Sequence, residues 1–252
     1  MQHDHIVLIT GASSGIGEAC AKAFAQQGAK LVLTARRIEK LQTFADHLRH
    51  TYQAQVAIFQ CDVRDPDSVQ QGLAQLPADF ANITVLINNA GLALGLEKMH
   101  EGNYQDWNQM IDTNIKGILH VTRQILPGML ARHKGHIIQI GSTSAYMTYP
   151  GGSVYCATKH AVQALTKTLS LEVAGTPLRV TEIDPGLVET EFSITRFKGD
   201  TKRAEKIYEN MTPLSGEDIA DAILYAVTRP AHVNIAQIML YPVDQPQAMR
   251  PS

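Results

Sequence analysis

The feature that most restricts the fold of this chain is a glycine-rich turn directly after a short apolar run. Residues 6–10 read Ile-Val-Leu-Ile-Thr, and Gly11-Ala-Ser-Ser-Gly15-Ile-Gly17 follows at once. Apolar residues then recur at helical spacing up to Gly28, which predicts a strand, a tight turn and a helix. Glycines in this context let the backbone approach a phosphate at the helix start. The turn therefore predicts a nucleotide site, and the alternative is a purely structural turn.

The next predicted strand begins at Lys30 and ends in two arginines, Arg36 and Arg37. An NAD-binding unit usually carries an acid here, about 20 residues beyond the glycine turn, for the ribose 2′-hydroxyl. Arginine instead suits a 2′-phosphate, because its planar fork of donors matches phosphate oxygens. This strand end therefore favours NADP over NAD, and the alternative is a pair of ordinary exposed charges.

Further apolar runs alternate with helical patterns and end in small polar residues. The runs cover residues 56–61, 84–88, 136–140 and 178–184, and no linker or repeat interrupts the chain. This alternation predicts an α/β fold with a parallel sheet covered by helices on both faces. Glu182 and Asp184 are unusual charges for a covered strand, so we expect them to have polar partners.

Tyr155 and Lys159 lie four residues apart, which places a phenol and an ammonium group on one helix face. A free tyrosine titrates near pH ~10, and a nearby cation favours its phenolate form. The pair is therefore a candidate for proton transfer. Pairs of this kind are also common on solvated helices.

These segments together resemble the short-chain dehydrogenase/reductase family over nearly the whole chain. The matching motifs are the turn from Thr10 to Gly17, Asn88-Asn89-Ala-Gly91, the set Ser142, Tyr155 and Lys159, and Asp184-Pro-Gly186 leading to Thr190. The resemblance implies an enzyme with a single-domain Rossmann fold, a doubly wound parallel sheet of about seven strands, and NADP as cofactor. It implies that Tyr155 is the general acid/base, that Lys159 lowers its pKa, that Ser142 holds the substrate oxygen, and that Asn114 anchors a proton relay. The residues expected to bind the cofactor are Gly11, Ser13, Ser14, Gly15, Ile16, Gly17, Arg36, Arg37, Asp62, Val63, Asn89, Ala90, Gly91, Tyr155, Lys159, Pro185, Gly186, Val188 and Thr190.

Within this family, the segment after Gly186 resembles the NADP-dependent 3-hydroxy acid dehydrogenases, or serine 3-dehydrogenases. The likeness implies hydride transfer between the nicotinamide and the 3-hydroxyl carbon of serine, allo-threonine or 3-hydroxypropionate. Alternatives are a broad carbonyl, ketone or sugar reductase that uses NADPH, and a nucleotide-binding regulator without catalysis. A carboxylate substrate requires a cation, and the candidates are Arg196, Lys198, Lys202 and Arg203. We select Arg196, together with Ser142 and Tyr155, as the substrate-binding set.

Composition restricts the remaining possibilities. With 252 residues and 44% apolar content, the chain can form one α/β core, so we expect a single domain over 1–252 with a lid at about 187–213. A net charge of −2 gives no reason to expect nucleic acid or a membrane as partner. The histidines and the three cysteines show no metal-ligand spacing, and unpaired cysteines suit the cytoplasm. The family resemblance also implies a homotetramer formed through the long helices at 104–134 and beyond Lys159. Trp107, Met110, Ile111, Ile115, Ile118 and Leu119 are expected to form a core stripe in the first of these helices.

Overall fold

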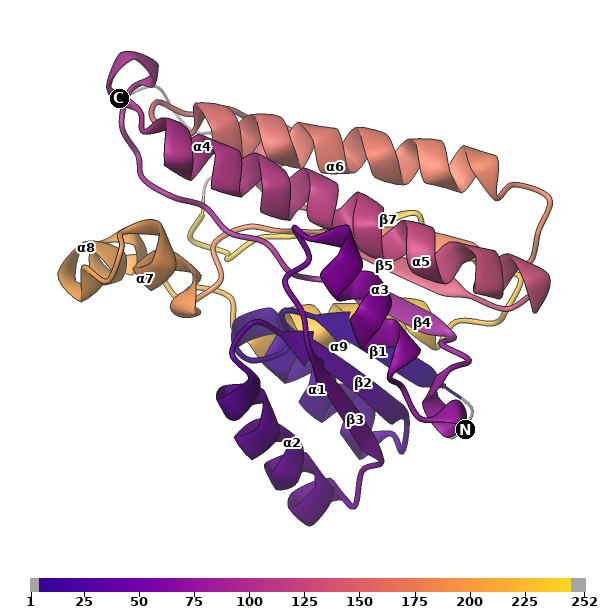
Figure 1. The fold of residues 1–252 in the computed structure, drawn as a ribbon. Coiled ribbons are helices and arrows are strands. Elements are labelled where there is room, and N and C mark those ends of the chain that lie inside the picture. Colours follow the sequence, from indigo (N-terminus) through magenta and orange to yellow (C-terminus); the bar gives the residue numbers. More distant parts are fainter. Residues whose placement is uncertain (1–4, 246–252) are drawn as a thin grey trace.

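The computed structural model describes residues 5–245 and is organised around one seven-stranded sheet (Figure 1). All strands are parallel and their order is β3-β2-β1-β4-β5-β6-β7. Their bounds are β1 Ile6–Thr10, β2 Lys30–Ala35, β3 Val56–Gln60, β4 Val85–Asn88, β5 His136–Ile140, β6 Arg179–Pro185 and β7 Gln237–Leu240. The strand order reverses beside β1, which in open α/β sheets marks the ligand crevice. The predicted fold class, a doubly wound parallel sheet of about seven strands, is confirmed.

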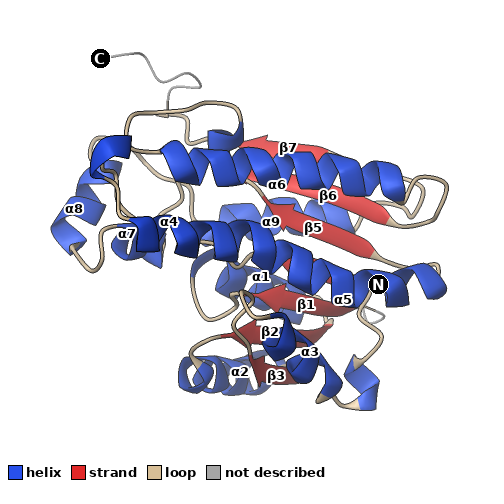
Figure 2. Ribbon diagram, turned by 45° about the horizontal axis from the view of Figure 1, so that its top comes forward, coloured by secondary structure: helices blue, strands red, loops and turns tan. Residues whose placement is uncertain are grey.

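Helices cover both faces of the sheet (Figures 1 and 2). On one face, α1 (Gly15–Gln26), α2 (Ile38–Tyr52) and α9 (Gly216–Val227) pack on alternate residues of the central strands, such as Val7 and Ile9. On the other face, α3 (Pro66–Ala74), α5 (Gly117–Ala131) and α6 (Ser153–Glu172) pack on the intervening residues, such as Leu8. Because both faces are covered, the strands are continuous apolar runs rather than alternating ones.

The long predicted helix at 104–134 is widened by one turn in its middle. It consists of α4 (Tyr104–Ile111), a π-helical turn at Asp112–Lys116, and α5. Met110 and Ile118 of the expected core stripe are buried, but Ile111 and Leu119 are exposed. The stripe was therefore wrong at these two positions. Leu119 follows the π turn, which adds a residue and rotates the side chains after it relative to a regular helix. Ile111 precedes that turn and lies about 100° around α4 from its buried neighbour Met110, so it faces outward.

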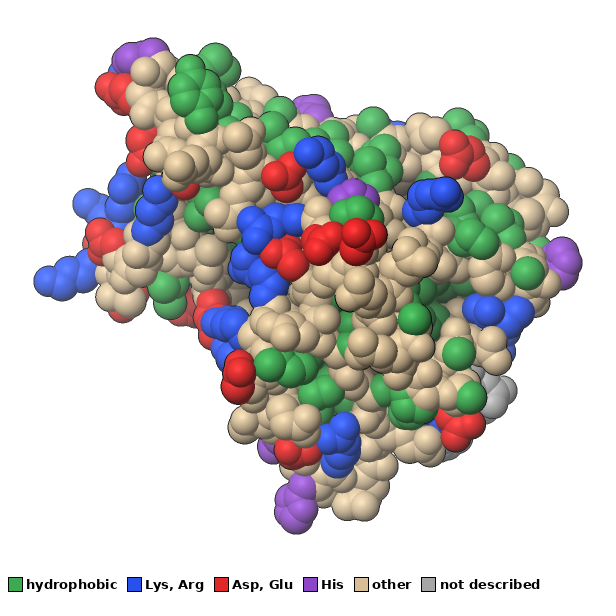
Figure 3. All heavy atoms as spheres, in the orientation of Figure 1, with side chains coloured by type: hydrophobic (Ala, Val, Ile, Leu, Met, Phe, Trp, Pro, Cys, Tyr) green, Lys and Arg blue, Asp and Glu red, His purple; other side chains and the backbone are tan. Residues whose placement is uncertain are grey.

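The segment expected to act as a lid contains two short helices, α7 (Glu191–Arg196) and α8 (Thr201–Glu205). They lie beside the carboxyl ends of the strands, and basic side chains project from this end of the molecule (Figures 2 and 3). Thr190 begins α7 by accepting a hydrogen bond from the Phe192 N–H, and Asp200 begins α8 in the same way with Arg203. Within residues 5–245, no helix is both long and apolar enough to cross a membrane.

Candidate active site

A cleft of about 760 Å³ lies at the carboxyl ends of the strands. Its walls include residues that directly follow β1, β3, β4 and β5 and the end of β6, as expected for an open parallel sheet. All of the predicted site residues line it except Gly17 and Asn114. Those lining it are Gly11, Ser13, Ser14, Gly15, Ile16, Arg36, Arg37, Asp62, Val63, Asn89, Ala90, Gly91, Ser142, Tyr155, Lys159, Pro185, Gly186, Val188, Thr190 and Arg196.

Three glycines give the turn after β1 its shape. Gly11 and Gly15 have φ angles of 65° and 56°, in the left-handed region that favours glycine. Gly17 has a packing role, because a Cβ there would lie 2.6 Å from both Asn89 Nδ2 and the Gly11 carbonyl oxygen. Asn89 in turn donates hydrogen bonds to the carbonyls of Thr10 and Gly11. The turn is thus fixed against the end of β4, with its backbone exposed to the cleft.

Ser142, Tyr155 and Lys159 meet on the opposite wall. The Ser142 side chain hydrogen-bonds the Tyr155 phenol, and Lys159 Nζ lies 5.8 Å from the centre of the Tyr155 ring. Lys159 Nζ also donates to the Ile140 carbonyl at 2.9 Å. Tyr155 and Lys159 come from the first two turns of α6, whereas Ser142 follows β5. The four-residue spacing therefore brings the phenol and the ammonium group together as predicted.

The electrostatics of these three residues depend on their burial. Burial raises the pKa of Tyr155 above its ordinary value, although the hydrogen bond from Ser142 acts in the opposite direction. Burial also lowers the pKa of Lys159 to about 8, while the carboxyl groups of Asp184 and Glu182 oppose that change. A protonated Lys159 close to the ring favours the phenolate of Tyr155. The cleft therefore holds a phenol and, next to it, a cation that favours ionisation of that phenol.

Asn114 lies within the π turn rather than on the cleft wall. Its side chain is fully paired: Oδ1 accepts from the Leu92 N–H at 2.9 Å, and Nδ2 donates to the Leu92 carbonyl and to Thr158 Oγ1. These bonds fix the loop after β4 against α6. The expected part of Asn114 in a proton relay stays a prediction, and π turns often occur at functional sites.

Two buried carboxyl groups support the catalytic wall from behind. Asp184 Oδ1 accepts from the Ser142 N–H at 2.9 Å, and Oδ2 accepts from Tyr146 Oη and Gln237 Nε2. The neighbouring Glu182 hydrogen-bonds to Asp184, and burial together with the Asp184 charge raises the pKa of Glu182. Three donors on Asp184 favour its ionised form, with Glu182 protonated beside it. Asp184 has the polar partners that we expected and fixes the backbone of Ser142, whereas Glu182 Oε1 is buried without a hydrogen-bond partner among the described residues.

Arg196 is the lid cation that lines the cleft. Its guanidinium carbon lies 5.1 Å from the centre of the Tyr155 ring, and Nη2 donates to Tyr149 Oη at 2.5 Å. Its Nε is buried without a hydrogen-bond partner among the described residues. Of the other three candidates, Lys198 pairs with Asp106, Arg203 stacks on Phe197, and Lys202 is exposed and does not line the cleft. Tyr149 was not predicted from the sequence, because nothing in its surroundings marks it as a partner of residue 196.

The two arginines after β2 point to different groups. Arg37 Nη2 donates to Glu191 Oε2 at 3.1 Å and lies 3.4 Å from Ser13 Oγ, whereas Arg36 lies close enough to Asp62 to help lower its pKa, after the larger effect of Arg64. Lys40 also reaches Glu191, and neither Lys40 nor Glu191 was predicted as a site residue. Two cations beside the glycine turn fit a cofactor with a 2′-phosphate, and no acid takes the place that an NAD-binding unit would give one.

Comparisons with known proteins agree with this geometry. A family model described as short chain dehydrogenase matches residues 5–201. An NADP-dependent 3-hydroxy acid dehydrogenase of Salmonella typhi is 49% identical over 241 residues, covering 95% of this chain and 96% of the relative. Sulfoacetaldehyde reductase 2 of Chromohalobacter salexigens is 42% identical, with 95% of each chain covered.

Among solved structures, the closed form of serine dehydrogenase complexed with NADP+ has a TM-score of 0.91 to this chain at 48% identity. That similarity covers 95% of this chain and 96% of the other. The part of the chain that matches the family model contains the glycine turn and Ser142, Tyr155 and Lys159, and the serine dehydrogenase structure has the same fold as this chain. This chain belongs to the short-chain dehydrogenase family.

Proposed function

We propose that the chain is an NADP-dependent oxidoreductase that acts on the 3-hydroxyl of small 3-hydroxy acids such as serine, allo-threonine and 3-hydroxypropionate. The observation that carries the proposal is an arginine, Arg196, in the same cleft as Tyr155 and Ser142. Its unpartnered Nε and its hydrogen bond to Tyr149 suit it to hold a carboxylate. The names of two relatives denote substrates with a small acid group, a carboxylate in one and a sulfonate in the other.

In this proposal each residue on the catalytic wall has one task. Tyr155 accepts the hydroxyl proton of the substrate, and Ser142 donates a hydrogen bond to the same oxygen. Lys159 stabilises the phenolate, and Asp184 holds the Ser142 backbone in position. Arg196 fixes the substrate carboxylate, so that the hydroxyl-bearing carbon is held near Tyr155. Asn114 contributes through the loop that it anchors.

The residues on the other wall fit NADP. We assign the pyrophosphate to the turn from Gly11 to Gly17 and the 2′-phosphate to Arg36 and Arg37. Asp62 and Val63 would lie beside the adenine, and Thr190 beside the carboxamide. When bound, the cofactor supplies the hydride acceptor or donor.

A second function uses the same residues in the reverse direction. The relative named sulfoacetaldehyde reductase 2 favours reduction of a small aldehyde that carries an acid group. Arg196 suits a sulfonate as well as a carboxylate, because both are anions with several acceptor oxygens. A broad ketone reductase would not depend on Arg196, and a nucleotide-binding regulator would show no turnover.

The first test measures NADPH absorbance with purified protein, NADP+ or NAD+, and a set of alcohols. The set contains L-serine, L-allo-threonine, 3-hydroxypropionate and an uncharged secondary alcohol, and sulfoacetaldehyde with NADPH tests the reverse direction. We expect turnover of the acids with NADP+, and a fall in kcat of about 100-fold or more in Tyr155→Phe with cofactor affinity retained. Tight NADP+ binding without turnover of any substrate would favour the regulatory alternative.

The second test concerns Arg196. We expect Arg196→Gln to raise KM for the 3-hydroxy acids about 10- to 100-fold, because a charge-assisted hydrogen bond is lost. KM for the uncharged alcohol should remain unchanged. Lys198→Gln is the matched control, since this lid cation pairs with Asp106 instead of lining the cleft. Equal effects of Arg196→Gln on acids and on the uncharged alcohol would contradict the carboxylate assignment.

We also propose a homotetramer in the cytoplasm. The long helices α5 and α6 form adjacent parts of one surface, and apolar side chains such as Leu119 and Leu171 are exposed on it. A groove of about 400 Å³ lies between the two helices. An exposed apolar surface of this kind is typical of a protein interface.

A further inference from the structure

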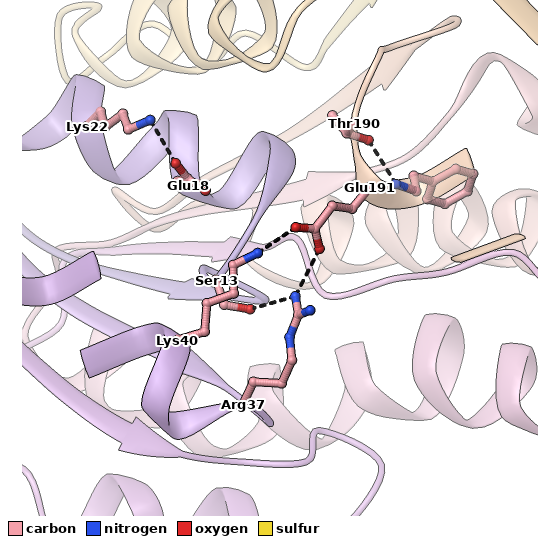
Figure 4. Close-up of polar contacts among 8 residues, drawn as sticks. Ser13, Glu18, Lys22, Arg37, Lys40, Thr190 and Glu191 are labelled. Carbon is pink, nitrogen blue, oxygen red and sulfur yellow. Dashed lines mark hydrogen bonds and ion pairs between the residues drawn. The ribbon is translucent and has the colours of Figure 1, made fainter. Parts of the chain in front are cut away.

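A lid carboxylate occupies the basic end of the cleft. Glu191 lies between Arg37 and Lys40 (Figure 4), with Oε2 3.1 Å from Arg37 Nη2 and Oε1 2.5 Å from Lys40 Nζ. Arg37 ends the segment after β2, Lys40 lies in the first turn of α2, and Glu191 is the first residue of α7. These two ion pairs join the lid to the part of the molecule that contains the glycine-rich turn. Arg37 and Lys40 are 154 and 151 residues away from Glu191 in the sequence.

Arg37 also contacts the glycine-rich turn, to which we assign the pyrophosphate. Arg37 Nη2 lies 3.4 Å from Ser13 Oγ, and Ser13, Arg37 and Glu191 all line the cleft. The hydrogen bonds from Lys40 and Arg37 lower the pKa of Glu191, so Glu191 is ionised at neutral pH. A carboxylate that bridges an arginine and a lysine with its two oxygens forms the same kind of contacts that a phosphate group makes.

A more highly charged anion can replace Glu191 in these two ion pairs. The side chains of Arg37, Glu191 and Lys40 are 55%, 45% and 39% exposed, and ion pairs in such positions are weak because water and salt screen them. A phosphate dianion carries more charge and more acceptor oxygens than a carboxylate. It would also repel a carboxylate held on the same donors.

On the basis of the proposed use of NADP, we propose that Glu191 and the 2′-phosphate of NADP+ compete for Arg37 and Lys40. Glu191 therefore limits how strongly the enzyme prefers NADP+ over NAD+, and Lys40 is a phosphate-binding residue. NAD+ has no group that displaces Glu191, so it leaves the contact between α7 and α2 in place. Because Glu191 directly follows Thr190, the exchange acts at the first residue of α7, within the lid.

Calorimetric titration of the purified full chain tests this competition. The ligands are NADP+, NAD+ and 2′,5′-ADP, which carries the 2′-phosphate but no nicotinamide. We expect Glu191→Gln to bind NADP+ and 2′,5′-ADP about three- to ten-fold more tightly and to bind NAD+ as the wild type does. Lys40→Gln should weaken NADP+ and 2′,5′-ADP about ten-fold and leave NAD+ unchanged.

Glu189→Gln is the matched control, because it removes a nearby exposed carboxylate that makes no contact with Arg37 or Lys40. It should change every dissociation constant less than about two-fold. In the double variant Glu191→Gln/Lys40→Gln, the gain in NADP+ affinity from removing Glu191 should be smaller than in the wild-type background. The reason is that Lys40, for which Glu191 and the 2′-phosphate compete, is gone.

The outcomes separate this inference from the proposed function. Unchanged or weaker NADP+ binding in Glu191→Gln would overturn the competition, and equal weakening of NADP+ and NAD+ in Lys40→Gln would overturn the phosphate assignment. If the wild type binds NAD+ as tightly as NADP+, the proposed NADP dependence itself fails. A wild-type preference for NADP+ combined with an inert Glu191→Gln would reject only the competition.

Discussion

His136 in β5 is buried, and only one of its two ring nitrogens has a hydrogen-bond partner among the described residues. Nε2 lies 2.7 Å from Thr181 Oγ1, and that hydroxyl donates its own proton to the Ile235 carbonyl at 2.6 Å. Nε2 must therefore donate, which leaves Nδ1 with an unshared lone pair. Burial lowers the pKa of His136 from 6.5 to about 3, with a smaller effect of Arg179.

This histidine predicts a loss of stability in mild acid. Below pH 6.5 the unfolded chain binds a proton that the native chain excludes. The contribution of His136 to the free energy of unfolding is therefore complete above pH 6.5. It falls as the pH drops toward 3, by about 1.4 kcal/mol per pH unit. We expect His136→Gln, which keeps a donor for Thr181, to reduce the slope of unfolding free energy against pH. Urea unfolding from about pH 6 to pH 4.5 measures it, and parallel slopes would contradict the prediction.

Single residues were predictable where one short segment carries their chemistry. Tyr155 and Lys159 share a helix face, so their spacing alone predicts that they meet. Tyr149, Glu191 and Lys40 were missed because their partners lie on distant elements. Glu191 is 151 residues from Lys40, and no local pattern indicates that pairing.

At the scale of elements, the packing of α1 against the sheet depends on Gly17, which has no side chain. A Cβ on Gly17 would lie 2.6 Å from Asn89 Nδ2 and from the Gly11 carbonyl oxygen, and 3.1 Å from Ala12 Cα. Two of these three contacts are with backbone, which cannot move aside as a flexible side chain can. The close approach fixes the start of α1 at the floor of the cleft.

We expect Gly17→Ala to lower the free energy of unfolding by about 1–3 kcal/mol and to weaken NADP+ binding, because α1 must move away from Asn89. Urea unfolding and calorimetric titration measure the two effects. Gly128→Ala is the matched control within α5, since its Cβ would meet only the far end of the long Arg132 side chain, whose Nη2 donates to the Ile83 carbonyl at 3.0 Å. That change should be neutral or stabilising by up to about 1 kcal/mol. Equal effects of the two substitutions would contradict the packing argument.

The elements themselves follow local signals to different degrees. Strands β1 to β6 are apolar runs bounded by glycine and polar residues, and their positions were predictable, whereas β7 was not located from the sequence. The π turn at Asp112–Lys116 was not, because a single extra residue leaves the apolar pattern nearly unchanged while it moves the later residue Leu119 outward. The two short lid helices depend on Thr190 and Asp200 as caps, within a stretch that otherwise reads as polar loop.

For the whole molecule, the alternation of strands and helices was sufficient to predict a doubly wound parallel sheet. The position of the cleft followed from the same rule, since carboxyl ends of parallel strands share one edge. The buried pair Glu182 and Asp184 is an example of what these patterns do not predict. The sequence marks both as unusual in a covered strand, but only the folded chain shows that Asp184 fixes Ser142 and that Glu182 pairs with Asp184.

The surface formed by α5 and α6 bears on assembly. Leu119 and Leu171 are 45% and 77% exposed on these two helices, and Leu126, Leu130 and Leu165 line the groove between them. Such side chains would be better buried against another protein surface, because each contacts water over an apolar area. A second copy of the same surface offers the matching apolar area, as a two-fold interface requires.

Together with the tetramer that the family resemblance implies, this surface leads us to expect four chains of 27.6 kDa to associate, with a mass of about 110 kDa by light scattering after gel filtration. Leu119→Glu and Leu171→Glu should each give a smaller species with unchanged circular dichroism, because a buried carboxylate without a partner is costly at an interface. Met99→Glu is the control, since Met99 is 68% exposed on a short 3₁₀ turn outside this surface. A monomeric wild type would refute the tetramer, and a tetramer that persists in both leucine variants would move the interface to another face.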